Sequence, residues 1–194
     1  MNSNTHLDTG VKKFGTASAQ FAGGTDNVQV DASSDFSYTG DFTYEFWVYP
    51  TSLTAQYEAF VWQSTGIDAA GEIYLSKYYH SGASPVPAAY QSIEIFNNSG
   101  TQTWATNNAS TSGGVLEFDA WNHIAFCRDG TVGRWYRNGV QLVTLSGGTS
   151  TLSGTYGSAT PDMYIGGDNA EHSSAQPLTG YIDEFRVSDN CRYP

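Results

Sequence analysis

Cysteine is scarce in this chain of 194 residues, which contains only Cys127 and Cys191. Two cysteines this far apart are too few for a disulfide framework or a zinc knuckle. Two interpretations remain open for them, a Cys127–Cys191 bridge or two free thiols that pack as small apolar side chains. At this length the chain can bury a full core without disulfides or metal, and we expect a single domain.

Basic residues are also few. Lys and Arg together number 8, against 19 Asp and Glu, so the formal net charge at pH 7 is −11. Nucleic-acid binding depends on Lys and Arg that displace counterions from the phosphates, and a chain this acidic repels them. We therefore expect no nucleic-acid partner.

Long apolar runs are absent. No segment approaches the roughly 18 uninterrupted apolar residues of a membrane helix, so we expect no membrane insertion. The first residues, Met1 to His6, lack the basic and apolar regions of a signal peptide. The sequence therefore predicts a chain that carries no export signal of its own.

Helical periodicity is missing, and alternation with a period of two takes its place. The alternating segments are Asn27–Val30, Phe42–Tyr49, Ser92–Phe96, His123–Arg128, Arg134–Tyr136, Val140–Leu145, Met163–Ile165 and Tyr181–Val187. Turn residues rich in Gly, Asn and Asp separate them. This pattern predicts an all-β antiparallel sandwich. Because no linker interrupts it, we expect one domain over residues 1–194, with residues 1–13 as an N-terminal arm.

The strongest hairpin signal is Asn138-Gly139, because this dipeptide supplies the two positive φ values of a type I′ turn. The least patterned region is Thr65–Gly114, where we expect long loops between strands. Loops carry function more often than the scaffold does. The exposed aromatic residues of this region are therefore our candidates for ligand contact, and they are Tyr78, Tyr79, Tyr90 and Trp104.

Several blocks of the sequence, in this order, resemble the laminin-G-like group of the concanavalin A-like lectin/glucanase superfamily. They are Phe14-Gly15 with Gln20-Phe21 and Asp26–Val30, then Phe42–Pro50, Trp121–Ala125, Tyr136–Gly139, Tyr164–Gly167 and Gly180–Val187. The resemblance implies a jelly-roll sandwich of two curved antiparallel sheets, the class that the alternation predicts independently.

A second resemblance concerns the segment Phe185–Pro194, which is similar to the ends of modules in structural proteins of tailed bacteriophages. It implies a virion surface protein, either a capsid decoration or a tail adhesion module, with other virion structural proteins as partners. Host or environmental glycans are the expected ligands. The alternative is a carbohydrate-binding module of a secreted bacterial protein, which would be extracellular.

The strand Phe42–Tyr49 has one apolar face and one mixed face, because successive side chains point to opposite sides. Trp47 lies on the mixed face, and the resemblance implies that such a face binds glycans. Two interpretations of Trp47 remain open. It stacks on a sugar ring, or it is buried beneath a covering loop while Glu45 pairs with an arginine.

Catalysis is not expected. Retaining hydrolysis of a glycosidic bond needs two carboxylates about 5.5 Å apart. The glucanases of the superfamily carry spaced acids along one strand, but Asp183 and Glu184 fall on opposite faces, and Glu45 has no acidic neighbour two or four residues away. We therefore predict no catalytic residue and no enzyme activity.

Two aspartates are candidates for calcium, a cation that prefers six to eight oxygen ligands. Asp26 follows the turn Gly23-Gly24, and Asp183 shares a strand face with apolar residues, where an isolated carboxylate is costly. The resemblance implies a calcium site at the rim of the sandwich. The alternative is that turn amides hydrogen-bond to both aspartates.

Overall fold

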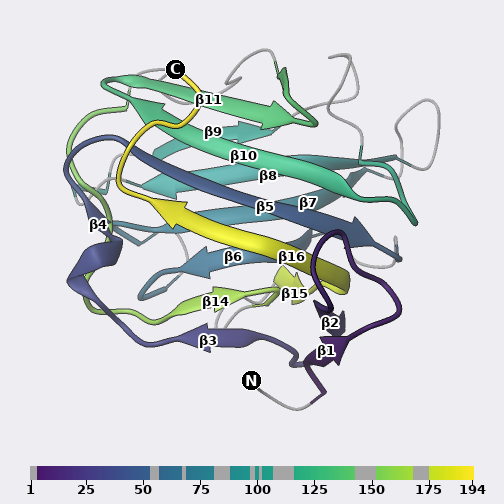
Figure 1. Ribbon diagram of the computed structural model, residues 1–194. Coiled ribbons are helices and arrows are strands. Elements are labelled where there is room, and N and C mark those ends of the chain that lie inside the picture. The colour runs from purple at the N-terminus through teal and green to yellow at the C-terminus, as the bar shows by residue number, and fades with distance from the viewer. Residues whose placement is uncertain are drawn as a thin grey trace.

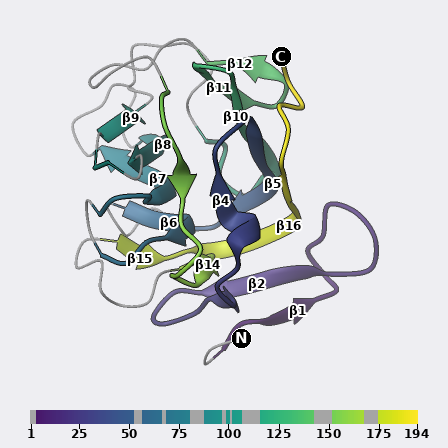
Figure 2. The ribbon, with the colours of Figure 1, turned by 90° about the vertical axis from the view of Figure 1, so that its left-hand side faces the viewer.

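The computed structural model describes residues 4–52, 57–66, 69–80, 88–96, 99–100, 102–106, 116–142, 152–167 and 175–194. For residues 78–80, 88–96, 102–106 and 175–176, only the backbone is described. Two β-sheets account for most of this part of the chain, and Figure 2 shows them as two layers side by side.

The first sheet lies in front in Figure 1 and has the strand order β1-β2-β16-β5-β10-β11-β12. All neighbouring strands in it are antiparallel. The strands are β1 (His6–Asp8), β2 (Ser18–Ala22), β16 (Thr179–Ser188), β5 (Phe42–Pro50), β10 (Asn122–Asp129), β11 (Val132–Arg137) and β12 (Val140–Gln141).

The second sheet has the order β3-β14-β6-β7-β8-β9, and β15 pairs in parallel with β6. Its strands are β3 (Val28–Val30), β14 (Met163–Ile165), β6 (Tyr57–Gln63), β7 (Ile73–His80), β8 (Ala88–Phe96), β9 (Gln102–Thr106) and β15 (Ala175–Pro177). A short ribbon of β4 (Ser37–Tyr38) and β13 (Tyr156–Gly157) follows the 3₁₀ turn η1 (Ser34–Phe36).

The core lies between the two sheets. On β5 the side chains of the predicted apolar face are fully buried, namely Phe42, Tyr44, Phe46 and Val48. They pack in one cluster with residues of β6 and β7, among them Phe60 and Leu75. The rings of Phe46 and Phe60 lie 5.6 Å apart across the sandwich. The predicted all-β sandwich is thus confirmed, and the described residues contain no α-helix.

The Asn138-Gly139 hairpin is confirmed as well. Asn138 has a φ of 49° and Gly139 a φ of 78°, as a type I′ turn requires. Arg137 of β11 pairs directly with Val140 of β12 on either side of the turn.

The region Thr65–Gly114 differs from our expectation, because β7, β8 and β9 occupy much of it and form a continuous part of the second sheet. Alternation is hard to recognise in β7 because Lys77, a charged residue, lies buried on its inner face. Within residues 1–13, which we expected to form an arm, β1 pairs with β2 at the edge of the first sheet.

Candidate functional site

Segments from near both ends of the chain cover parts of the outer face of the first sheet. Trp47 of β5 is half-buried there beneath a loop of the N-terminal region. The Phe14 ring lies 5.8 Å from the Trp47 ring, and Lys13 Nζ lies 4.1 Å from its centroid. Trp47 is thus partly covered by a loop, as in the alternative that we gave to stacking on a sugar ring.

Glu45, two residues before Trp47, is buried and surrounded by cations. Its Oε1 lies 3.1 Å from Arg192 Nε and 3.4 Å from Arg186 Nη1. Its Oε2 accepts a hydrogen bond from the Tyr193 hydroxyl and lies 3.9 Å from His123 Nε2. Glu45 therefore pairs with arginine, as the second interpretation of this strand required, and both of its oxygens are engaged.

The two predicted calcium ligands accept hydrogen bonds from the backbone. Asp183 Oδ2 accepts from the amides of Lys13 and Phe14 at 2.8 and 3.0 Å. Asp26 is almost fully buried, and its oxygens accept from the amides of Asn4 and Ala22 at 3.0 and 2.8 Å. Amide protons aimed at these oxygens do not fit a cation in the same place.

The described residues also contain no group of three acidic, histidine or cysteine side chains that would hold a metal. Calcium at Asp26 and Asp183 therefore stays a prediction, and these hydrogen bonds do not favour it.

The outer face of the second sheet is built differently. Cross-strand pairing aligns Tyr164 of β14 with Trp62 of β6, and Trp62 with Tyr74 of β7. The same line continues through Glu94 of β8 to Trp104 of β9. We call these five residues the aromatic row. Directly opposite residues share one face of a sheet, so by register these five positions form a line across it.

The described side chains of the aromatic row pack against one another. Trp62 is fully buried and Tyr74 nearly so, and they form a small cluster with Ala59 against which the half-buried Tyr164 packs. The rings of Trp62 and Tyr164 lie 5.9 Å apart. Trp62 Nε1 donates a hydrogen bond of 3.3 Å to the carboxylate of Glu72, so the polar edge of the indole is satisfied.

Beside the aromatic row runs a line of short residues, the small-residue row, which consists of Ala59, Ser76, Ser92 and Thr106 in register. Beyond it, Tyr57, Tyr78 and Tyr90 are aligned across β6, β7 and β8. Ser76 is fully buried, and within the described part of the chain its hydroxyl has no hydrogen-bond partner. The second sheet thus places short residues between two aromatic bands.

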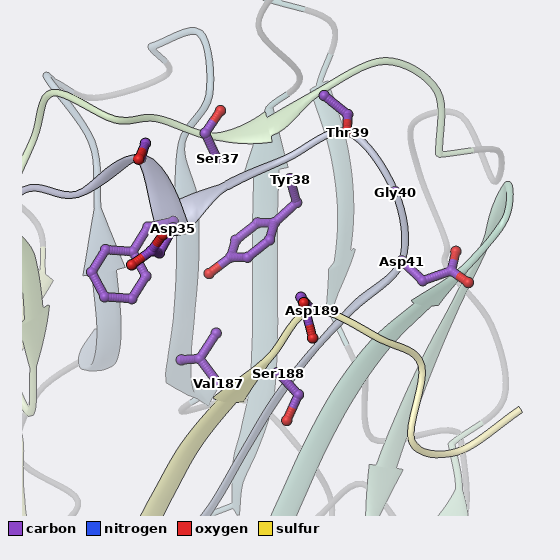
Figure 3. A pocket seen from close by; sticks show the side chains of 11 residues that line it. Asp35, Ser37, Tyr38, Thr39, Gly40, Asp41, Val187, Ser188 and Asp189 are labelled. Carbon is purple, nitrogen blue, oxygen red and sulfur yellow. The ribbon is translucent and has the colours of Figure 1, made fainter.

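A separate hollow of about 580 Å³ lies at the edge of the sandwich, between the segment around β4 and the end of β16 (Figure 3). Its lining consists of Ser34–Asp41 together with Val187, Ser188 and Asp189. Burial raises the pKa of Tyr38 to about 12, and its hydroxyl lies 3.2 Å from that of Tyr44. This lining combines aspartate and hydroxyl side chains with the apolar Phe36 and Val187, and it offers fewer aromatic residues than the second sheet.

A family model described as the concanavalin A-like lectin/glucanases superfamily matches residues 22–194. The chain belongs to this superfamily. The model spans most of the chain and includes every segment of the resemblance except the first residues of its earliest block. No curated protein sequence matches the chain.

Solved structures of the same fold include sugar-binding domains. Domain 4 of AbnA, an extracellular arabinanase from Geobacillus stearothermophilus, was solved with arabinotriose; it has a TM-score of 0.58 and 18% identity, over 96% of this chain and 75% of that one. The CBM40 domain of a Ruminococcus gnavus sialidase, bound to α2,3-sialyllactose, has a TM-score of 0.58 and 13% identity, over 87% of this chain and 92% of that one. Mouse laminin α1 domains LG4-5 have a TM-score of 0.56 and 16% identity, over 87% of this chain and 40% of that one.

Within this lectin-like fold, the structure separates the ligand residues that we predicted. By register, Tyr78 and Tyr90 lie on the outer face of the second sheet, and so does Trp104. Tyr79 follows Tyr78 on β7 and therefore lies at a position of the opposite face. The side chains of these four residues are outside the described part, and Trp47 belongs to the other sheet.

The sequence analysis missed four aromatic residues of the same face, Tyr57, Trp62, Tyr74 and Tyr164. A signal existed for Tyr164, because it is the middle residue of the alternating segment Met163–Ile165 and must point away from its two apolar neighbours. The other three lie in strands that we did not predict.

Proposed function

We propose that this chain is a non-catalytic carbohydrate-binding domain whose ligand lies along the outer face of the second sheet. The observation that carries the proposal is the register that places the small-residue row between two aromatic bands. Aromatic faces contribute contact area at little cost in conformational entropy, and sugar rings present C–H faces that match them. The sugar complexes of two structural neighbours support a ligand of this class.

The dimensions of the face fit a short glycan. The aromatic row crosses β14, β6, β7, β8 and β9, and strands lie about 4.8 Å apart, so the row extends over about 19 Å. The short residues Ala59 and Ser76 between the bands are fully buried, and the half-buried Tyr57 and Tyr164 are the described aromatic side chains of this face that a ligand can reach. Ser76 also supplies a buried hydroxyl that has no partner within the described residues.

The buried carboxylates that the structure describes support the non-catalytic part of the proposal. Glu45 is held by arginines, Asp183 by amides and Glu72 by Trp62. Glu58 is buried on the inner face with Lys77. Each of these acids has a structural partner, whereas a hydrolase needs two carboxyl groups that face the scissile bond.

For the biological setting our first proposal is a virion surface protein that assembles with other virion structural proteins. A module of a secreted bacterial protein is the alternative, and an extracellular place of action is common to both. Mass spectrometry of purified particles from the source decides between them. Detection at high copy number supports the virion, and absence from the particles supports the secreted module.

The binding test is a glycan array with the wild type and a Tyr57→Ala, Tyr164→Ala double variant. We expect the double variant to lose at least tenfold in affinity while it still folds, because each ring loss removes a stacking contact. The matched control is Tyr49→Ala, Tyr181→Ala, which removes two half-buried tyrosines from the outer face of the first sheet. A reducing-sugar assay on the same glycans tests for hydrolysis, and released sugar would contradict the non-catalytic assignment.

A second comparison uses neighbouring residues of one type. By register, Tyr78 and Tyr79 lie at positions of opposite faces of β7. Tyr78→Ala should weaken glycan binding, and Tyr79→Ala should affect stability instead. Equal loss of binding in both variants, or a glycan array on which the folded wild type binds nothing, would contradict a site on this face.

A further inference from the structure

Cys127 and Cys191 lie next to each other in the fold although they are 64 residues apart in the chain, and their Sγ atoms are separated by 3.1 Å. Cys127 is buried on β10, and Cys191 is half-buried in the segment Asp189–Pro194, which we call the C-terminal segment. We propose that an oxidant of the disulfide class converts these thiols into a disulfide that fastens the C-terminal segment to the first sheet. This proposal does not depend on the carbohydrate-binding function.

Hydrogen bonds on both sides of Cys191 hold the two sulfurs together. Thr43 of β5 is paired directly with Cys127, and its Oγ1 donates to the Asn190 carbonyl at 2.7 Å. The same oxygen accepts from the Arg192 amide at 3.1 Å. Because the residues before and after Cys191 are both bound to Thr43, Cys191 is fixed opposite Cys127.

The rest of the C-terminal segment is bound to the same sheet (Figure 1). The Tyr193 carbonyl accepts a hydrogen bond of 2.9 Å from the Tyr136 hydroxyl and one of 3.3 Å from the Cys127 thiol. The Arg192 and Tyr193 side chains bind Glu45. The bridge would therefore reinforce an arrangement that already exists and would require little movement of the backbone.

The accessible thiol reacts first. Burial raises the pKa of the Cys127 thiol to about 12, so Cys127 is protonated in the first step, while the more exposed Cys191 meets the oxidant. With oxidised glutathione, the Cys191 thiolate attacks one sulfur, the glutathione S–S bond breaks, and one glutathione thiolate leaves. Cys127 then loses its proton and attacks the Cys191 sulfur, and the second glutathione leaves. Two thiols are oxidised, and one disulfide is reduced to two glutathiones that take up the two protons.

The experiment treats the full chain with oxidised glutathione and compares it with chain kept in a reducing agent. We expect an intact mass lower by about 2 Da and a peptide that links Cys127 to Cys191. We also expect a Tm higher by about 8 to 16 °C, because a closed loop of this length restricts the unfolded chain. Amide exchange at Arg192 should slow at least tenfold, because opening of the segment then requires unfolding.

Cys127→Ser and Cys191→Ser are the matched controls, and neither should show a difference in Tm between the two treatments. Glutathione retained on Cys191 of the wild type, with no internal bridge, would overturn the proposal. A bridge that forms without raising Tm or slowing exchange at Arg192 would overturn its second part, the fastening of the segment.

Discussion

Lys77 and Glu58 form an ion pair on the inner face of the second sheet, where both side chains are buried. Lys77 Nζ lies 2.8 Å from Glu58 Oε1 and donates a hydrogen bond of 2.6 Å to the Ser52 carbonyl. The two residues are directly opposite each other on β6 and β7. Burial raises the pKa of Glu58 and lowers that of Lys77, and the attraction between them opposes both shifts. Each charge is tolerated in the interior because the other is present.

Removal of one partner should therefore be more harmful than removal of both. We expect Lys77→Met to lower the free energy of unfolding by about 3 to 5 kcal/mol, because Glu58 is left buried without its cation. The double variant Lys77→Met, Glu58→Leu should recover most of this loss. Urea denaturation of the three proteins measures the difference, and a single variant as stable as the wild type would contradict the pair's role.

Gly139 offers a clean test of backbone conformation. A Cβ at Gly139 or at Gly40 would meet no atom within 4 Å, but only Gly139 has a φ, of 78°, in the left-handed region. Gly139→Ala should lower the free energy of unfolding by about 1 to 2 kcal/mol. Gly40→Ala should be neutral or slightly stabilising. Thermal unfolding compares the two, and equal effects would be incompatible with the turn.

His123 should make stability depend on pH. Burial lowers its pKa, with the charge of Arg192 adding to the shift and Glu45 opposing it. The unfolded chain therefore binds a proton at His123 more readily, starting below about pH 6.5. The stabilising contribution of neutral His123 is complete above that pH and is lost as the pH falls through the folded pKa.

We expect the wild type to lose stability between pH 7.5 and pH 5.5 more steeply than His123→Gln. Denaturation midpoints measured across this range provide the comparison. Parallel curves for the two proteins would show that His123 titrates alike in the folded and unfolded states.

At the scale of strands, local patterns predicted part of the fold. Strand β5 followed from the alternation of Phe42–Tyr49, and the β11–β12 hairpin from Asn138-Gly139. Strand β7 could not be predicted in this way, because its inner face carries the charged Lys77. That residue is tolerated there only because Glu58 lies opposite it on β6, and the two meet only in the folded chain. A period of two cannot reveal a partner on another strand.

The loop that joins β1 to β2 is attached to β16 by Asp183, whose Oδ2 accepts the amides of Lys13 and Phe14. Asp183→Ala should free this loop, lower the free energy of unfolding by about 2 kcal/mol and expose Trp47 to solvent. Asp183→Asn keeps an oxygen acceptor and should lose less. Thermal unfolding and tryptophan fluorescence report the two effects.

Metal removal separates this arrangement from calcium binding. If amides alone satisfy the carboxylates, EDTA should leave the Tm of the wild type unchanged. A ligand that binds only the folded state raises Tm by mass action. If EDTA lowers the Tm and added calcium restores it, the calcium site would be established.

For the molecule as a whole, the class of the fold could be predicted, but the candidate site could be predicted only in part. Tyr78, Tyr90 and Trp104 were identified as ligand candidates, yet Tyr79 was grouped with them because strand positions in that region were unknown. Trp62 and Tyr164 join the same face only through pairings between strands about a hundred residues apart. Such register is set by long-range packing, and a local pattern does not contain it.

The outermost strands that the structure describes are short. The first sheet ends in β1, with three residues, and β12, with two, while the second ends in β3, with three, and β9, with five. Aggregation between folded β-proteins often begins when long, unpaired sheet edges meet and add strand to strand. Edges of this length offer few consecutive amide and carbonyl groups to a neighbour. The folded chain should therefore remain dispersed at the high local concentrations at which many copies of a β-rich domain crowd together.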